Sequence, residues 1–104
     1  MAHRAIFITH TTLPGARGRV QAIWQRHMQA AIETNPHHLS YHYCFDVASE
    51  DVIRVFQLYT DQHAATEFLQ SAAYNAYLTE VESLLLGPPE LATADQEWAK
   101  TATA

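Results

Sequence analysis

Residues 60–89 constrain the fold most, because they combine two helical patterns with a break between them and a marked end. In the second pattern, apolar residues recur at intervals of three and four, which predicts one apolar stripe along a helix. The stripe consists of Tyr74, Tyr77, Leu78, Val81, Leu84 and Leu85. Gly87 before two prolines predicts the helix end, with the glycine in the left-handed conformation. Asp61 is placed to cap a shorter helix that stops before residues 71–73.

The rest of the chain reads as strands around one further helix. β-Branched and aromatic residues predict strands at residues 5–12, 38–47 and 52–59, with a possible edge strand at 90–95. The helix after the first strand ends at Asn35-Pro36 and carries on one face Val20, Ile23, Trp24, Met28, Ala31 and Ile32. This β-α-β-β-α-(α)-β order predicts an α+β, ferredoxin-like fold with an antiparallel sheet and helices on one face. We expect a single domain over residues 1–97 and a tail over 98–104, anchored only by Trp98.

Composition limits the possible partners. The chain has 104 residues, enough for one core, and a formal charge of −5 with scattered arginines and lysines. Nucleic acid and anionic membranes are therefore not expected partners, since both are bound through clustered positive charge. The single Cys44 excludes an intramolecular disulfide. No apolar run reaches the length of a signal-peptide core or of the roughly 20 residues of a membrane span, so we expect a cytoplasmic protein.

The strand over residues 38–47 alternates between two kinds of side chain. One side carries Leu39, Tyr41, Tyr43, Phe45 and Val47, and the other carries His38, Ser40, His42, Cys44 and Asp46. If the helices cover the mixed side, the apolar side needs a second sheet, which predicts a homodimer that buries the Tyr41/Tyr43/Phe45 face. If the helices cover the apolar side instead, this pattern requires no partner.

The order of segments also resembles a known family. A strand, a short helix and the pattern Leu69-x-Ser71…Tyr74-x-x-Tyr77-Leu78…Leu85-x-Gly87-Pro88 resemble the antibiotic biosynthesis monooxygenase domain over residues 5–95. The resemblance implies a dimeric α+β barrel, in which two sheets pack face to face and each subunit has a pocket between its sheet and its helices. It also implies a monooxygenase that oxidises quinols or polycyclic phenols with O2 without a cofactor. Related proteins degrade haem, and others have no known activity.

Three positions depart from the pattern of these relatives. Phe68 stands where many have a histidine, or a tryptophan in the haem-degrading branch. The last helix offers Tyr74 and Tyr77 but no histidine, and Gln57-Leu58-Tyr59 replaces a frequent Glu-x-Trp. Haem degradation is therefore not expected. Phe68 favours an alternative, a non-catalytic protein that binds a small aromatic ligand or responds to stress, whereas His10 favours the enzyme.

His10 is the leading catalytic candidate. It ends the first strand on the side of Ile6 and Ile8, and a histidine can remove a phenolic proton near neutral pH. Its alternative is an ordinary sheet-edge histidine bonded to backbone or water. The resemblance and the aromatic pattern add Tyr74 as a second catalytic candidate and, as substrate-binding candidates, Trp24, His42, Phe68 and Tyr77. For most of these aromatic residues, the alternative is simple core packing.

No metal and no cofactor are expected. His42 and Cys44 lie two residues apart on one strand and, with His10, could in principle form a metal site, but their spacing matches no ligand motif. The chain lacks a Ser-His-Asp arrangement, a phosphate loop, a CxxC pair and a dinucleotide fingerprint. His37 and His38 connect a helix to a strand and are expected to be solvated.

Overall fold

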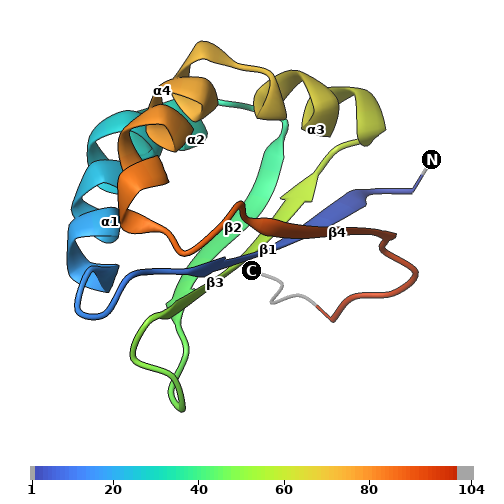
Figure 1. Ribbon diagram of the computed structural model, residues 1–104. Helices are drawn as coiled ribbons and strands as arrows, with labels where there is room; N and C mark the ends of the chain where they lie inside the picture. Colours follow the sequence, from blue (N-terminus) through green and yellow to red (C-terminus); the bar gives the residue numbers. More distant parts are fainter. Residues whose placement is uncertain (1, 101–104) are drawn as a thin grey trace.

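One antiparallel sheet of four strands lies against a layer of helices (Figure 1). The computed structural model describes residues 2–100. The strands are β1 (Arg4–Thr11), β2 (His38–Phe45), β3 (Val52–Tyr59) and β4 (Glu90–Asp95), in the order β2-β3-β1-β4. The helical segments are α1 (Arg17–Trp24), the π-helix η1 (Gln25–Gln29), α2 (Ala30–Glu33), α3 (Gln62–Leu69), α4 (Ala72–Val81) and the 3-10 helix η2 (Glu82–Leu84). The α+β, ferredoxin-like fold is confirmed.

Side-chain caps begin the two helices of the second half. The Asp61 carboxylate accepts a hydrogen bond from the Ala64 N–H at 2.8 Å, and the Ser71 hydroxyl accepts one from the Tyr74 N–H at 3.2 Å. Each cap satisfies a backbone donor that has no partner inside its helix. The predicted start at Asp61 is therefore confirmed, whereas the break lies at Gln70 and Ser71 and not over residues 71–73, because Ala72 already belongs to α4.

The helix that begins with α4 ends earlier than the predicted end at Gly87. Regular helix stops at Leu84, and the left-handed glycine of the described residues is Gly15, with φ of 77°, not Gly87. The cause is a competing set of backbone bonds to the end of β1. The Leu13 N–H donates to the Leu84 carbonyl and the Leu86 N–H to the Thr11 carbonyl. These bonds pull the chain out of the helix before the glycine is reached.

The prediction that a second subunit buries the Tyr41/Tyr43/Phe45 face is wrong, because the helices of the same chain cover it. Tyr41 and Tyr43 pack against the helix layer, where the Trp24 ring lies 5.7 Å from the first and 4.5 Å from the second. Phe45 lies under the Arg17 guanidinium of α1, 4.0 Å from its ring centre. The helices therefore cover the apolar side of β2, because it supplies the larger hydrophobic area to bury.

The opposite side of the sheet, which we call the outer face, carries its own apolar residues. The strand register places Ala92, Phe7, Phe56 and His42 in one row across all four strands. The Phe7 and Phe56 rings are 5.2 Å apart, and Phe7 is 46% exposed. Leu58 lies beside this row, two residues from Phe56 on β3. The helical segments lie on the other side (Figure 1).

The C-terminal residues extend beyond β4 without secondary structure as far as residue 100. The Gln96 N–H still donates to the His3 carbonyl. Trp98 is 80% exposed, so the expectation that it anchors the tail is wrong for the described residues. The remainder of the expected tail, residues 101–104, lies outside the described part of the chain.

Between residues 2 and 100, we find no helix with the length and apolar character needed to span a membrane.

Candidate functional site

His10 lies buried between the sheet and the helices, as its parity with Ile6 and Ile8 predicted. Only 3% of the residue is exposed, and its ring meets Tyr77 of α4 edge-on at 5.9 Å. The His10 Nε2 atom and the Tyr77 hydroxyl are 3.3 Å apart and hydrogen-bonded. With the proton on Nε2, the ring donates to Tyr77 and leaves the Nδ1 lone pair free. Within residues 2–100, Nδ1 has no hydrogen-bond partner.

Burial keeps this imidazole uncharged. Desolvation lowers the pKa of His10 from 6.5 to about 4, because a charged ring in the interior would lose its hydration. At neutral pH, His10 is therefore present in its basic form. This is the protonation state that a proton acceptor needs before its substrate arrives.

The pKa of His10 also predicts an acid-dependent loss of stability. Between pH 6.5 and about 4, the unfolded chain takes up a proton on His10 that the folded protein does not bind, so stability falls as the pH falls. We expect protonation of His10 in the unfolded chain to lower the free energy of unfolding by about 3 kcal/mol between pH 6.5 and about 4. Urea unfolding across this range should show the loss in the wild type and a reduced loss in His10→Gln. An identical pH dependence in both proteins would contradict the burial of a neutral His10.

Tyrosine hydroxyls surround the same interior. Burial raises the pKa values of Tyr41, Tyr43, Tyr59, Tyr74 and Tyr77 above the ordinary value of 10.0. All five groups remain protonated at neutral pH and can donate hydrogen bonds. The Tyr74 ring lies 6.3 Å from that of Tyr77, which brings both predicted tyrosines to the helix side of one site.

Trp24 contributes a second aromatic wall. Its Nε1–H donates to the Tyr41 hydroxyl at 3.1 Å, while its ring stacks on Tyr43. Trp24 is the last residue of α1, directly before η1. A π-helical turn contains one residue more than an α-helical turn and therefore changes the direction in which the neighbouring side chains point. The Tyr43 hydroxyl is buried and has no hydrogen-bond partner in the described chain.

His38 belongs to the interior, so the expectation that it is solvated is wrong. The pairing of β2 with β3 shifts between His38 and Ser40, a bulge that turns His38 to the same side as Tyr41. Its ring lies 4.4 Å from that of Tyr59 and 4.5 Å from that of Phe68. Burial lowers the pKa of His38, while its hydrogen bond to Gln57 acts in the opposite direction. His37 is exposed, as expected.

The predicted site residues thus fall into three places. His10, Tyr74 and Tyr77 form one end of the interior, with Trp24 close to Tyr43 beside them. Phe68 lies at the other end, against His38 and Tyr59. His42 lies on the outer face, 5.9 Å from Phe56, and therefore does not face this interior. The described residues contain no group of three or more histidine, cysteine or acidic side chains that could hold a metal.

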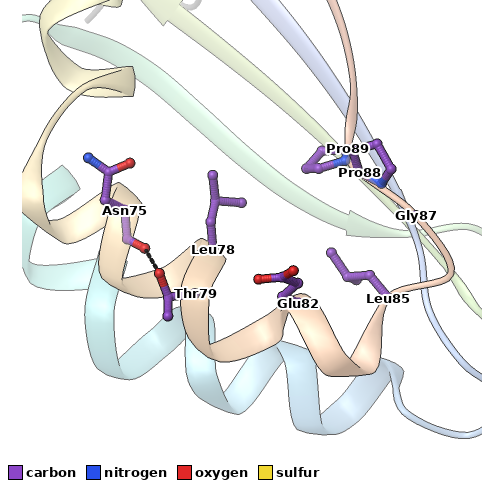
Figure 2. A pocket seen from close by; sticks show the side chains of 8 residues that line it. All are labelled: Asn75, Leu78, Thr79, Glu82, Leu85, Gly87, Pro88 and Pro89. Carbon is purple, nitrogen blue, oxygen red and sulfur yellow. Dashed lines mark hydrogen bonds between the residues drawn. The ribbon is translucent and has the colours of Figure 1, made fainter.

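Two surface hollows border parts of the aromatic interior, and neither is lined by His10, Tyr74 or Tyr77. One of about 180 Å³ is lined partly by Phe68, Ala64 and Ser71, and another of about 260 Å³ by Trp24, Tyr41 and Ile32. A third, of about 390 Å³, lies along a different side of α4 and contains none of the predicted site residues (Figure 2). Its lining consists of Asn75, Leu78, Thr79, Glu82, Leu85, Gly87, Pro88 and Pro89.

Comparisons with known proteins agree with this architecture. A sequence model described as antibiotic biosynthesis monooxygenase matches residues 3–80. Among solved structures, a protein of unknown function from Nitrosomonas europaea is similar, with a TM-score of 0.83 and 15% identity over 100% of this chain and 98% of that one. A provisionally assigned antibiotic biosynthesis monooxygenase from Caulobacter crescentus CB15 gives a TM-score of 0.84 and 16% identity over 91% and 90%.

A Mycobacterium tuberculosis protein gives a TM-score of 0.78 and 19% identity over 99% of both chains. At these identities, the likeness shows the fold and not the activity. Among curated proteins, none is similar to this chain in sequence.

Proposed function

Because this chain belongs to the antibiotic biosynthesis monooxygenase family, we propose that it oxidises a quinol or polycyclic phenol with O2 and without a cofactor. The observation that supports this most is His10, a buried and uncharged imidazole with a free nitrogen inside an aromatic interior. A phenol bound there would meet a base, several hydroxyl donors and flat aromatic walls. This combination suits proton removal from an electron-rich ring.

The reaction begins with transfer of the phenolic proton to His10 Nδ1. The phenolate passes one electron to O2, and the resulting ring radical and superoxide combine to form a carbon–oxygen bond at a ring carbon that bears hydrogen. Protonation by His10 gives a hydroperoxide. Loss of the carbon-bound proton then breaks the O–O bond, releases water and leaves a quinone carbonyl. One oxygen atom enters the product and the other leaves in water.

The surrounding residues support these steps without taking part in the redox chemistry. Tyr77 bonds to His10 Nε2, and when Tyr77 accepts the Nε2–H, the ring is held with the Nδ1 lone pair free. Tyr74 has a hydroxyl that can donate to a substrate oxygen. The interior around His10 excludes water, since the residue is 3% exposed, and water would otherwise hydrate the phenolate and trap the radical pair.

Oxygen consumption tests this proposal directly. We expect the wild-type protein to consume O2 with at least one member of a panel of anthrones, naphthols and hydroquinones, with one quinone formed for each O2 consumed. Because no cofactor is needed, dialysis against a chelator should leave the rate unchanged. A panel without turnover would contradict the proposed oxidation.

Phe68 supports a second candidate, a non-catalytic protein that binds a small aromatic molecule. Its ring packs on His38 and Tyr59 at a position where a polar or reactive side chain would be needed for some of the family's chemistry. Tight binding of an aromatic ligand from the same panel, with no oxygen consumption by any member, would favour this function over the oxidation.

We further propose that the protein acts as a homodimer through the outer face. The Phe7 and Phe56 rings lie in contact there, and Leu58 extends the apolar area beside them. Helices do not cover this side within the described chain (Figure 1). A second copy that packs the same face across a two-fold axis would bury these residues against their equivalents. This replaces the Tyr41/Tyr43/Phe45 surface as the proposed interface.

A further inference from the structure

Gln57 lies at the centre of the sheet with a buried donor that the fold does not use. The residue is fully buried on β3, where it faces the helices between Ile6 of β1 and Tyr41 of β2. Its Nε2 atom has no hydrogen-bond partner among residues 2–100. A buried amide donor without a partner is costly, so its presence calls for an explanation.

A chain of hydrogen bonds fixes the orientation of this amide. The Asn35 Oδ1 atom accepts from the His37 N–H at 3.1 Å, so the Asn35 Nδ2 is the atom that faces His38 Nδ1 at 2.9 Å. Because Nδ1 accepts this bond, the His38 proton resides on Nε2. That Nε2–H donates to the Gln57 Oε1 at 3.3 Å, and the Tyr59 hydroxyl donates to the same oxygen.

The Gln57 NH2 group is therefore left without a hydrogen-bond partner within residues 2–100. With Oε1 held by two donors, the Gln57 NH2 group cannot exchange places with it without setting donors against donors. Gln57 bonds to His38 and Tyr59, which places it at the Phe68 end of the interior, away from His10.

The strand register gives the distance between Gln57 and His10. Gln57 lies opposite Ile6 on β1, and His10 is four residues further along the same strand. At about 3.3 Å for each residue, their backbones are about 13 Å apart along the strand. The Tyr43 hydroxyl, also without a partner in the described chain, belongs to the strand position between them. A single benzene ring is too short to bridge this distance, whereas a fused ring system extends along it.

We propose that Gln57 is the second anchor of the ligand site, donating its Nε2–H to a phenolate or carbonyl oxygen at one end of a fused aromatic molecule whose other end reaches His10. This inference rests on the proposed function and narrows the substrate to elongated polycyclic compounds with oxygens at opposite ends. His38 and Tyr59 act as positioning residues, because they hold the amide by its oxygen.

Binding of two test ligands distinguishes this role from a structural one. We expect 2,6-dihydroxyanthraquinone, which has oxygens at both ends, to bind the wild type at least tenfold more tightly than anthracene. Gln57→Met should weaken the dihydroxy compound about tenfold and leave anthracene unchanged. Gln57→Glu keeps an acceptor for His38 and Tyr59 but lacks the amide donor, and should show the same selective loss. The exposed Gln25→Met is the matched control and should change neither affinity.

A second measurement follows ligand binding in the wild type and uses a variant only to assign the signals. The side-chain NH2 resonances of Gln57, assigned by their absence in Gln57→Glu, should shift when the dihydroxy compound binds and stay in place with anthracene. Unshifted resonances, or an equal loss of both ligands in Gln57→Met, would overturn the role of Gln57 while leaving the interior site intact. Failure of the wild type to bind either ligand would instead overturn the interior site, and with it both proposals.

Discussion

Replacing His10 with alanine is expected to lower kcat by roughly 10²–10⁴-fold, the range that is typical of losing a general base. His10 is the proposed proton acceptor, and its side-chain hydrogen-bond partner within residues 2–100 is the Tyr77 hydroxyl, not a carboxylate. Its loss leaves the phenol protonated, and a neutral phenol passes an electron to O2 far less readily than a phenolate. Steady-state oxygen consumption measures the change, and circular dichroism verifies that the variant is folded.

Chemical rescue separates a missing base from a damaged fold. Imidazole added to His10→Ala should restore part of the rate, because the small base can occupy the space left by the ring. Tyr77→Phe is the companion variant. It retains the base but removes its hydrogen bond, and we expect a smaller loss than for His10→Ala. In the wild type, kcat/KM should fall only as the pH approaches about 4, the pKa of His10 in the free protein. An unchanged rate in His10→Ala would refute the assignment of His10 as the base.

Local signals in the sequence predicted most of the elements. β3 occupies residues 52–59 as expected, and the uncertain edge strand at 90–95 is β4. The caps at Asp61 and Ser71 are short-range interactions, so a few neighbouring residues suffice to predict them. The helix end near Gly87 was misplaced because its true cause, the bonds to Thr11 and Leu13, joins residues more than seventy positions apart.

The direction of β2 could not be predicted from alternation alone. The pattern divided the strand into two sides but did not specify which side the helices would cover. A bulge then moved His38 from one set to the other, and bulges leave no clear mark in this sequence. Trp24 of α1 packs against Tyr41 and Tyr43, the large aromatic partners that the apolar side of β2 offers.

The candidate site, too, could be predicted only in part from the sequence. His10 was found because strand parity places it next to two buried isoleucines. Gln57 was noted in the sequence only as a departure from the family pattern. Its importance depends on bonds to His38 and Tyr59, and on the donor that these bonds leave over. Such a network combines the bulge, a loop asparagine and a central strand, none of which signals the others in the sequence.

The revised interface changes which substitution tests the dimer. Tyr43→Glu does not test the dimer. Because Tyr43 packs under Trp24, a buried carboxylate there would unfold the chain whether or not it dimerises. A useful substitution must lie on the outer face and leave the interior of the protomer untouched. Phe7 meets both conditions, since it is 46% exposed and its neighbours Ile6 and Ile8 supply the interior packing.

Phe7→Asp is expected to convert the dimer to a monomer. Burial of a phenylalanine contributes about 1.5–3 kcal/mol, and a two-fold interface loses this contribution twice, so the dissociation constant should rise roughly 10³-fold. Sedimentation at low micromolar concentration should show a dimer for the wild type and a species near the chain mass of 11.7 kDa for the variant. Val47→Asp, an apolar-to-acidic change in the exposed turn after β2, should remain dimeric. A wild-type protein that sediments as a monomer would refute the interface, and so would a Phe7→Asp variant that stays dimeric.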